Sequence, residues 1–156
     1  SKSRQLDTLM DKAEPETIAR AAEELGCRSV AYTYNDPVIF HEYAIDVARA
    51  CREAGVKSVA VSAGYVTPEP RREFYGWMDA ANIDLKAFTE DFYQQHCAAK
   101  LAPVLETLEV LADIGIHKEI VVLVIPPLNE ERRLELVKVL ARRAVARAAD
   151  RAGEVR

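Results

Sequence analysis

The chain has 156 residues, of which 49% are hydrophobic and 29% charged, and its formal net charge is −4. These values are typical of a soluble globular protein with one modest core, so we predict a single domain over residues 1–156. No apolar run approaches the roughly 18 residues needed to cross a bilayer, nothing at the start resembles an export signal, and the acidic balance argues against extended nucleic-acid binding.

Helices and strands alternate along the chain. A helix over 15–25 is predicted because Pro15 suits its first turn and Gly26 its end. Asp36 and Pro37 resemble an N-cap and first turn, followed by an apolar stripe at helical spacing that stops at Gly55. The later helices are expected from about Pro68, over 89–97, over 101–115 and over 129–150.

Four short runs rich in β-branched, aromatic or other apolar residues indicate strands, over 28–34, 57–63, 80–87 and 117–126. Near-continuous apolar strands separated by helices favour parallel pairing, with helices covering the sheet. The fold class is therefore α/β, and the pattern alone leaves open a piece of a (β/α) barrel or an open sheet. The segment 130–156 is predicted to be a basic C-terminal helix.

Three cysteines, Cys27, Cys51 and Cys97, are odd in number and widely spaced. This pattern indicates a reducing compartment, so we predict a cytoplasmic location and no disulfide framework. We expect three small buried or half-buried thiols. No cysteine or histidine has the spacing of a metal site, and no metal ligand is predicted.

Ligands of parallel α/β folds collect at the carboxyl ends of the strands, and four polar segments end the predicted strands. These segments are TYNDP, VSAGY, DLKAF and VIPPLN. Asp36 in the first is an N-cap, a group that binds a cationic or hydroxyl-bearing ligand, or both, because a carboxylate has several acceptor sites. Ser62 and Gly64 in the second form an ordinary turn or a close approach of backbone to a ligand.

The stretch NIDLK places Asn82, Asp84 and Lys86 at every second position, so the three side chains share one face of a strand. Burying an unpaired Asp or Lys costs several kcal/mol, so these groups must pair or lie in a wet site. A structural ion pair between Asp84 and Lys86 and a polar ligand-binding wall are the two interpretations.

The stretches SVAYTYNDPVIFHEYAIDVARACREAGVKSVAVSAGY and DAANIDLKAFTEDFY resemble radical SAM enzymes related to pyruvate formate-lyase activating enzyme, in particular the AmmeMemoRadiSam system branch. The resemblance covers about residues 1–129. It implies a partial (β/α)6 barrel that binds S-adenosylmethionine against a [4Fe–4S] cluster. Asp36 stands in place of an acid that faces the ammonium of the methionine moiety, and Asp84 and Lys86 match a motif near the cofactor. The residues that the resemblance places at the cofactor are Tyr34, Asn35, Asp36, Ser62, Gly64, Asp84 and Lys86.

The chain departs from the family in lacking its three cysteines at C-x3-C-x2-C spacing, the thiolates that hold such a cluster. We therefore expect a chain shortened at its N-terminus, with no cluster ligands and no activity alone. Relatives usually carry a glycine where Pro127 stands, and the match fades after Asn129.

The first functional hypothesis is a fragment of a radical SAM enzyme that reductively cleaves S-adenosylmethionine to a 5′-deoxyadenosyl radical. Its expected partners are a protein or small-molecule substrate and an electron donor such as flavodoxin or ferredoxin. The second is a cluster-less α/β binding or interaction module. The third is a lyase or aldolase fragment that uses Lys86 as an amine nucleophile, which the neighbouring Asp84 opposes.

Overall fold

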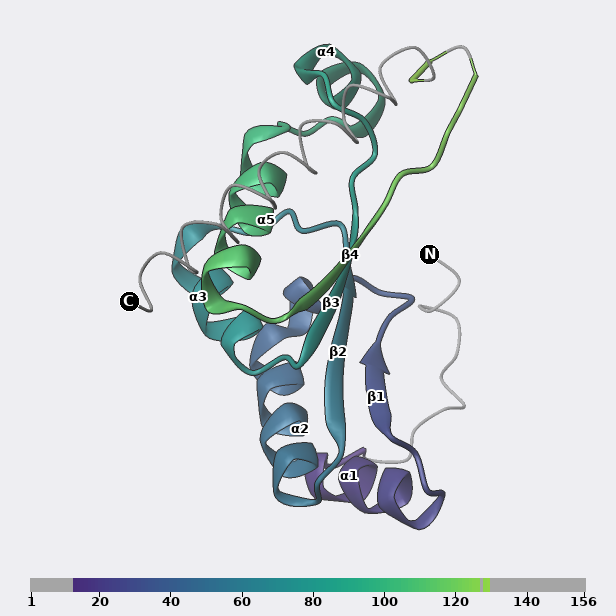
Figure 1. The fold of residues 1–156 in the computed structure, drawn as a ribbon, viewed down its shortest axis with the longest axis vertical. Coiled ribbons are helices and arrows are strands. Elements are labelled where there is room, and N and C mark those ends of the chain that lie inside the picture. Colours follow the sequence, from purple (N-terminus) through teal and green to yellow (C-terminus); the bar gives the residue numbers. More distant parts are fainter. Residues whose placement is uncertain (1–12, 127, 130–156) are drawn as a thin grey trace, which may run out of the picture.

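The computed structural model describes residues 13–126 and 128–129, which contain a four-stranded parallel sheet in the order β1-β2-β3-β4 (Figure 1). The strands are β1 (Ser29–Tyr32), β2 (Lys57–Ser62), β3 (Ala80–Asp84) and β4 (His117–Val121). Each pairs in parallel with the next, so their carboxyl ends lie at one edge of the sheet. The α/β prediction with four parallel strands and alternating helices is confirmed.

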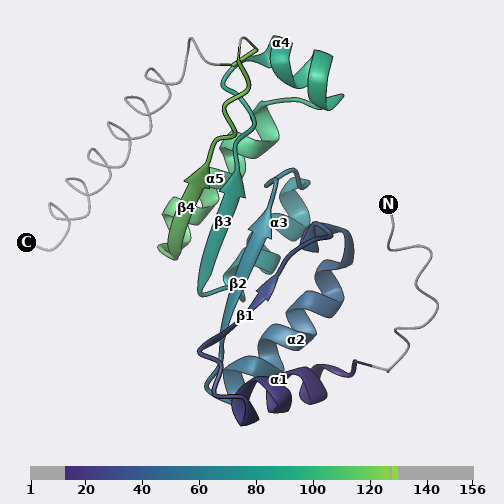
Figure 2. The same ribbon diagram turned by 90° about the vertical axis from the view of Figure 1, so that its right-hand side faces the viewer.

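The helices α2 (His41–Glu53), α3 (Pro68–Gly76) and α5 (Ala102–Ile114) lie along one face of the sheet (Figures 1 and 2). Helix α1 (Pro15–Glu24) packs against α2 near the start of the strands. The short α4 (Glu90–Phe92) continues as a π-helix, η3 (Tyr93–Cys97), beyond the carboxyl end of β3. Among the described residues, no helix covers the opposite face of the sheet.

Local sequence explains several of these boundaries. Proline occupies the first turns of α1, α3 and α5, where its missing N–H costs nothing and its fixed φ suits the helix. Gly115 ends α5 in the left-handed conformation, at φ 78°. The Thr89 side chain accepts a hydrogen bond from Phe92 N and so caps α4.

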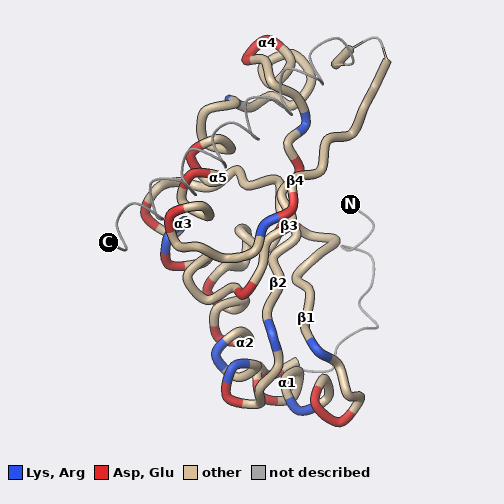
Figure 3. The backbone as a smooth tube through the Cα atoms, in the orientation of Figure 1, with Lys and Arg blue, Asp and Glu red and all other residues tan. Residues whose placement is uncertain are grey.

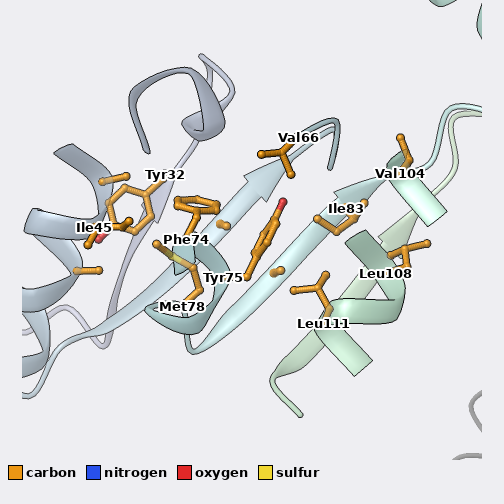
Figure 4. Packing of buried hydrophobic residues seen from close by; sticks show 14 of the residues in the cluster. Tyr32, Ile45, Val66, Phe74, Tyr75, Met78, Ile83, Val104, Leu108 and Leu111 are labelled. Atoms are coloured by element: carbon orange, nitrogen blue, oxygen red, sulfur yellow. The ribbon is translucent and has the colours of Figure 1, made fainter. Parts of the chain in front are cut away.

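The hydrophobic core lies between the sheet and the helices, where Phe74 and Tyr75 of α3 pack against the strands (Figure 4). Strand β3 and its continuation alternate strictly: Ile83 and Leu85 are fully buried in this core. The intervening Asp84 and Lys86 are half-buried and lie on the face away from the helices. The polar side of β3 is therefore the side that the described helices leave uncovered.

All four predicted strands extend too far, β2 by a single residue, since it ends at Ser62 and not at residue 63. β1 ends at Tyr32 and not at residue 34, because the chain turns sharply at Tyr34. β3 was predicted to reach residue 87 and β4 residue 126, but they end at Asp84 and Val121. Beyond β3, the side chains of Tyr93 and Asn129 bind the backbone N–H and C=O of Lys86, so these groups are not available to pair with a neighbouring strand.

The prediction of a buried or half-buried thiol is wrong for Cys27, which is exposed. Cys27 lies in the connection between α1 and β1, outside the core strands. The predicted helix over 129–150 lies outside the described residues, apart from Asn129.

No helix within the described ranges is long and apolar enough to span a membrane. Acidic and basic residues are interspersed over α1, α2 and α3 (Figure 3).

Candidate functional site

The candidate site is the edge of the sheet formed by residues 34–36, 62–64 and 84–86, called here the C-terminal edge. Because β1, β2 and β3 are adjacent and parallel, Asp36 and Asp84 lie at the same end of the sheet. The pairing of Ser62 with Ile83 places the end of β2 beside the end of β3. The structure thus brings all seven sequence-predicted residues to one edge, in two groups with different contacts.

Asp36 is bound on three sides by its own chain. Its Oδ1 accepts hydrogen bonds from Ser62 Oγ at 2.7 Å and from Val38 N at 3.3 Å, and its Oδ2 accepts one from Ala63 N at 2.9 Å. The contact with Val38 is the expected N-cap. The contacts with the end of β2, across 26 and 27 residues, were not predicted. The carboxylate therefore ties the loop after β1 to the tip of β2.

Tyr34 lies in a strained turn just before this tie. Its φ is 70°, and Asn35 N donates to Thr33 O at 3.0 Å, which closes a three-residue turn around Tyr34. This form of γ-turn is rare and costly for a residue with a side chain. The Tyr34 side chain is fully exposed, at 104%. Strain of this kind persists only where the surroundings impose it, and the anchored Asp36 two residues on supplies that constraint.

Ser62 and Gly64 have contacts within the chain that account for both residue types. Ser62 is 3% exposed, and its hydroxyl donates to Asp36 while accepting from Gly64 N at 2.9 Å. Gly64 has φ 69°, and a Cβ there would stand 3.1 Å from Ile83 Cγ2. Its carbonyl accepts from Thr107 Oγ1 at 2.7 Å. Packing against β3 and α5 therefore explains this glycine without a ligand.

Asp84 and Lys86 form an ion pair at the tip of β3. Lys86 Nζ lies 2.6 Å from Asp84 Oδ2, and both side chains are 40% exposed. The third polar residue of this face, Asn82, donates to Glu119 Oε2 at 3.1 Å. An ammonium has three N–H donors, so the contact with Asp84 leaves capacity for a ligand oxygen. This arrangement suits a charged ammonium and not the amine nucleophile of the lyase alternative.

Two residues that sequence reasoning did not single out hold the backbone of Lys86. Lys86 N donates to Tyr93 OH at 3.2 Å, and Asn129 Nδ2 donates to Lys86 O at 2.9 Å. Burial raises the pKa of the Tyr93 phenol, although the hydrogen bond from Lys86 acts in the opposite direction. Asn129 stands in VIPPLN, which was expected at this edge, but nothing in its local pattern indicates a partner 43 residues away.

The described residues do not fit a [4Fe–4S] cluster. Within the part of the chain that the structure describes, no three His, Cys, Asp or Glu side chains are grouped as metal ligands. Cys27, Cys51 and Cys97 are free cysteines with different degrees of exposure. The donors at the C-terminal edge are instead an ammonium, carboxylates, an amide and an exposed phenol, which suit a polar organic ligand.

The partial barrel of radical SAM proteins is likewise built on a parallel α/β sheet, with polar groups at the carboxyl ends of its strands. A domain of a pyruvate-formate lyase-activating enzyme from Bacteroides vulgatus matches the fold with a TM-score of 0.61 at 18% identity, over 70% of this chain and 68% of that one. The model of the Radical SAM superfamily matches residues 2–140, and the chain belongs to this superfamily.

Two curated relatives are similar in sequence. An uncharacterized protein of Methanocaldococcus jannaschii is 36% identical over 116 residues, which are 74% of this chain and 34% of that protein. The 4-hydroxyphenylacetate decarboxylase activating enzyme of Clostridium scatologenes is 26% identical over 82 residues, which are 53% of this chain and 26% of that enzyme. The matched part of the chain thus spans about a third or less of each relative's length.

Proposed function

We propose that the chain forms the S-adenosylmethionine-binding edge of an activating-enzyme-like radical SAM enzyme, a protein that cleaves this cofactor reductively. The observation that carries the proposal is the strained, fully exposed turn at Tyr34, at the same edge as the half-exposed Asp84–Lys86 pair. Membership of the superfamily supports the cofactor class. The likeness to activating enzymes, in fold and in sequence, supports the subclass.

The two groups of residues would bind different parts of the ligand. The turn at Tyr34 and Asn35 would present its ring, its amide and its carbonyl oxygens to the ligand, with the carbonyls suited to the methionine ammonium. Asp36 already accepts three hydrogen bonds, so its first role would be to hold this turn in place. The free N–H donors of Lys86 suit the carboxylate of the same amino-acid moiety.

In such an enzyme a [4Fe–4S] cluster would supply the electron for cleavage of S-adenosylmethionine, and its thiolate ligands would come from outside this sequence, because the described residues offer no such set. We therefore expect that the chain alone, after anaerobic reconstitution, contains no stoichiometric four-iron cluster by iron and sulfide analysis. A stoichiometric cluster in the chain alone would contradict this expectation and show that its cysteines assemble in a way the structure does not indicate.

Isothermal titration calorimetry with S-adenosylmethionine tests the binding role directly. Lys86→Met should weaken affinity about tenfold, because it removes a charge-assisted hydrogen bond to the ligand carboxylate. Lys57→Met is the matched control, since Lys57 forms a similar ion pair with Asp79, at 2.8 Å, at the opposite end of the sheet. Equal losses in both variants, or no binding by the unaltered chain, would contradict the proposal.

A cluster-less binding module is the second candidate, and the hydrogen bonds that Asp36, Ser62 and Gly64 form within the chain favour it. The codons that precede Ser1 in the gene discriminate between the two. Three cysteines at C-x3-C-x2-C spacing immediately upstream support the enzyme, and a start codon with no such cysteines supports the module.

A further inference from the structure

Lys86 is held by other side chains at both of its backbone polar groups. One residue earlier, Leu85 N still donates to Val121 O at 2.9 Å, as in a continuing ladder. At Lys86 the pattern changes, because its N–H donates to Tyr93 OH and its carbonyl accepts from Asn129 Nδ2. The backbone of the one lysine at the C-terminal edge is thus fixed by residues 7 and 43 positions away.

The Asn129 side chain connects the segment that follows β3 to the segment that follows β4. Its Nδ2 donates to Lys86 O at 2.9 Å and to Leu123 O at 2.7 Å, while its Oδ1 accepts from Ile125 N at 2.6 Å. Both donors and the acceptor of the amide are therefore in use. The segment 122–126 no longer pairs with β3 as a strand, so this single side chain joins the chain beyond β4 to the chain beyond β3.

Tyr93 supports Lys86 from the other side. Its side chain is buried at 3% exposure and begins the π-helix η3, an irregularity that often accompanies functional sites. The left-handed Ala98, at φ 50°, ends this helix, and Ala98 N donates to Tyr93 O. The segment after β3, which contains α4 and η3, therefore places the buried Tyr93 phenol within hydrogen-bond distance of the Lys86 amide.

We propose that Asn129 and Tyr93 are positioning residues that fix Lys86 so that its ammonium stays beside Asp84 and faces the ligand. The proposal rests on the proposed function for the ligand, but not for the geometry. A lysine has four flexible side-chain torsions, so an unanchored one loses much freedom when it binds. The two backbone contacts fix the position from which the side chain extends, and the ion pair with Asp84 restrains its ammonium, so part of that loss is met in advance.

The test uses the full chain with Tyr93→Phe, Asn129→Asp and Asn129→Ala. Phenylalanine keeps the ring but removes the oxygen, and aspartate keeps the shape but cannot donate to Lys86 O. Gln94→Ala is the control, because Gln94 is exposed, adjacent to Tyr93 and bonded to Glu90 and not to Lys86. Three quantities are measured: the exchange rate of the Lys86 amide, the acylation rate of the Lys86 side-chain amine, and the affinity for S-adenosylmethionine.

Tyr93→Phe should speed exchange of the Lys86 amide about tenfold, and all three variants should speed acylation of Lys86 several-fold, with no change in Gln94→Ala. Each should weaken binding of S-adenosylmethionine about fivefold, yet leave 5′-methylthioadenosine, which lacks the amino-acid moiety, unaffected. In a Lys86→Met background the same substitutions should cause no further loss of affinity, since their effect passes through Lys86.

Unchanged exchange and acylation rates, or losses of affinity that add to that of Lys86→Met, overturn the proposal. If the unaltered chain binds no S-adenosylmethionine, the proposed function fails, and the acylation and exchange rates alone decide the positioning role. If Asn129→Ala does not fold, Asn129→Asp and Tyr93→Phe still give the decisive rates.

Discussion

Two aspartates at neighbouring strand tips, Asp36 and Asp84, have opposite surroundings. The Asp36 carboxylate accepts hydrogen bonds from two backbone amides and from a buried serine hydroxyl. The Asp84 carboxylate meets one lysine side chain, and both partners are 40% exposed. Three donors from the chain hold the first carboxylate in place, while the second retains a partner that a ligand can engage.

The difference teaches that residue type and strand position do not assign a role. Both acids stand at the carboxyl end of a parallel strand, where ligand-binding groups collect. What separates them is the supply of donors that cannot move away: Ser62 and Ala63 are fixed in the tip of β2, whereas Lys86 projects from the uncovered face. An acid with three donors from the chain supports the fold first, and an acid whose one partner is a half-exposed side chain remains available for binding.

Replacing each aspartate tests this contrast most strongly. Asp36→Ala should lower the free energy of unfolding by about 3 kcal/mol, because it leaves the Ser62 hydroxyl and two backbone amides without their acceptor. Asp84→Ala should cost less than about 1 kcal/mol, the usual value of a solvent-exposed ion pair. Urea unfolding of both variants measures the difference, and equal losses would remove the distinction.

The turn between β2 and α3 gives the next largest effect. Gly64→Ala should destabilise the protein by about 2 to 3 kcal/mol, because the left-handed backbone disfavours a Cβ and that Cβ would stand 3.1 Å from Ile83 Cγ2. Gly26→Ala is the control: Gly26 has φ +67° but no atom within 4 Å of the added Cβ. Its smaller loss should report the backbone term alone, and identical losses would show that packing does not matter at Gly64.

Relief of strain at Tyr34 should have the opposite sign. Tyr34→Gly should raise the free energy of unfolding by up to about 1 kcal/mol, because glycine adopts a positive φ freely, and should weaken binding of S-adenosylmethionine. Ala98, with φ 50°, is the other non-glycine residue with positive φ in the described ranges. Ala98→Gly should also stabilise but leave affinity unchanged. A Tyr34→Gly variant that binds normally would show that the exposed ring is not part of the site.

The smallest effect concerns Asp79, which ties β2 to β3 at the other end of the sheet. Burial favours the protonated form of Asp79, but hydrogen bonds from Lys57 Nζ and Ser58 N outweigh it and lower the pKa of this carboxyl below its ordinary 3.8. A lowered folded-state pKa means that the stabilisation is fully present above the ordinary value and is lost as the pH falls through the folded value.

Urea unfolding between about pH 6 and about pH 2 should therefore show a loss of under about 1 kcal/mol that Asp79→Asn abolishes. A loss of stability that persists unchanged in Asp79→Asn would assign the acid sensitivity to other carboxylates.

The sequence alone determined the elements, their order and the faces they bury. Pro15, Pro68 and Gly115 mark helix ends through their own backbone preferences, and the alternation around Ile83 and Leu85 identifies the core side of β3. Such signals are readable because a residue and its nearest neighbours set the local conformation and the period of burial.

Only the tertiary structure decided which polar groups meet. The partners of Asp36 lie 26 and 27 residues away, and Asn129 reaches Lys86 across 43 residues. The end of β3 shows the same dependence, since the backbone groups of Lys86 bond the side chains of Tyr93 and Asn129 and not a neighbouring strand. Hydrogen-bond partners of this kind depend on how strands and helices pack in space, and no local pattern of residues records that arrangement.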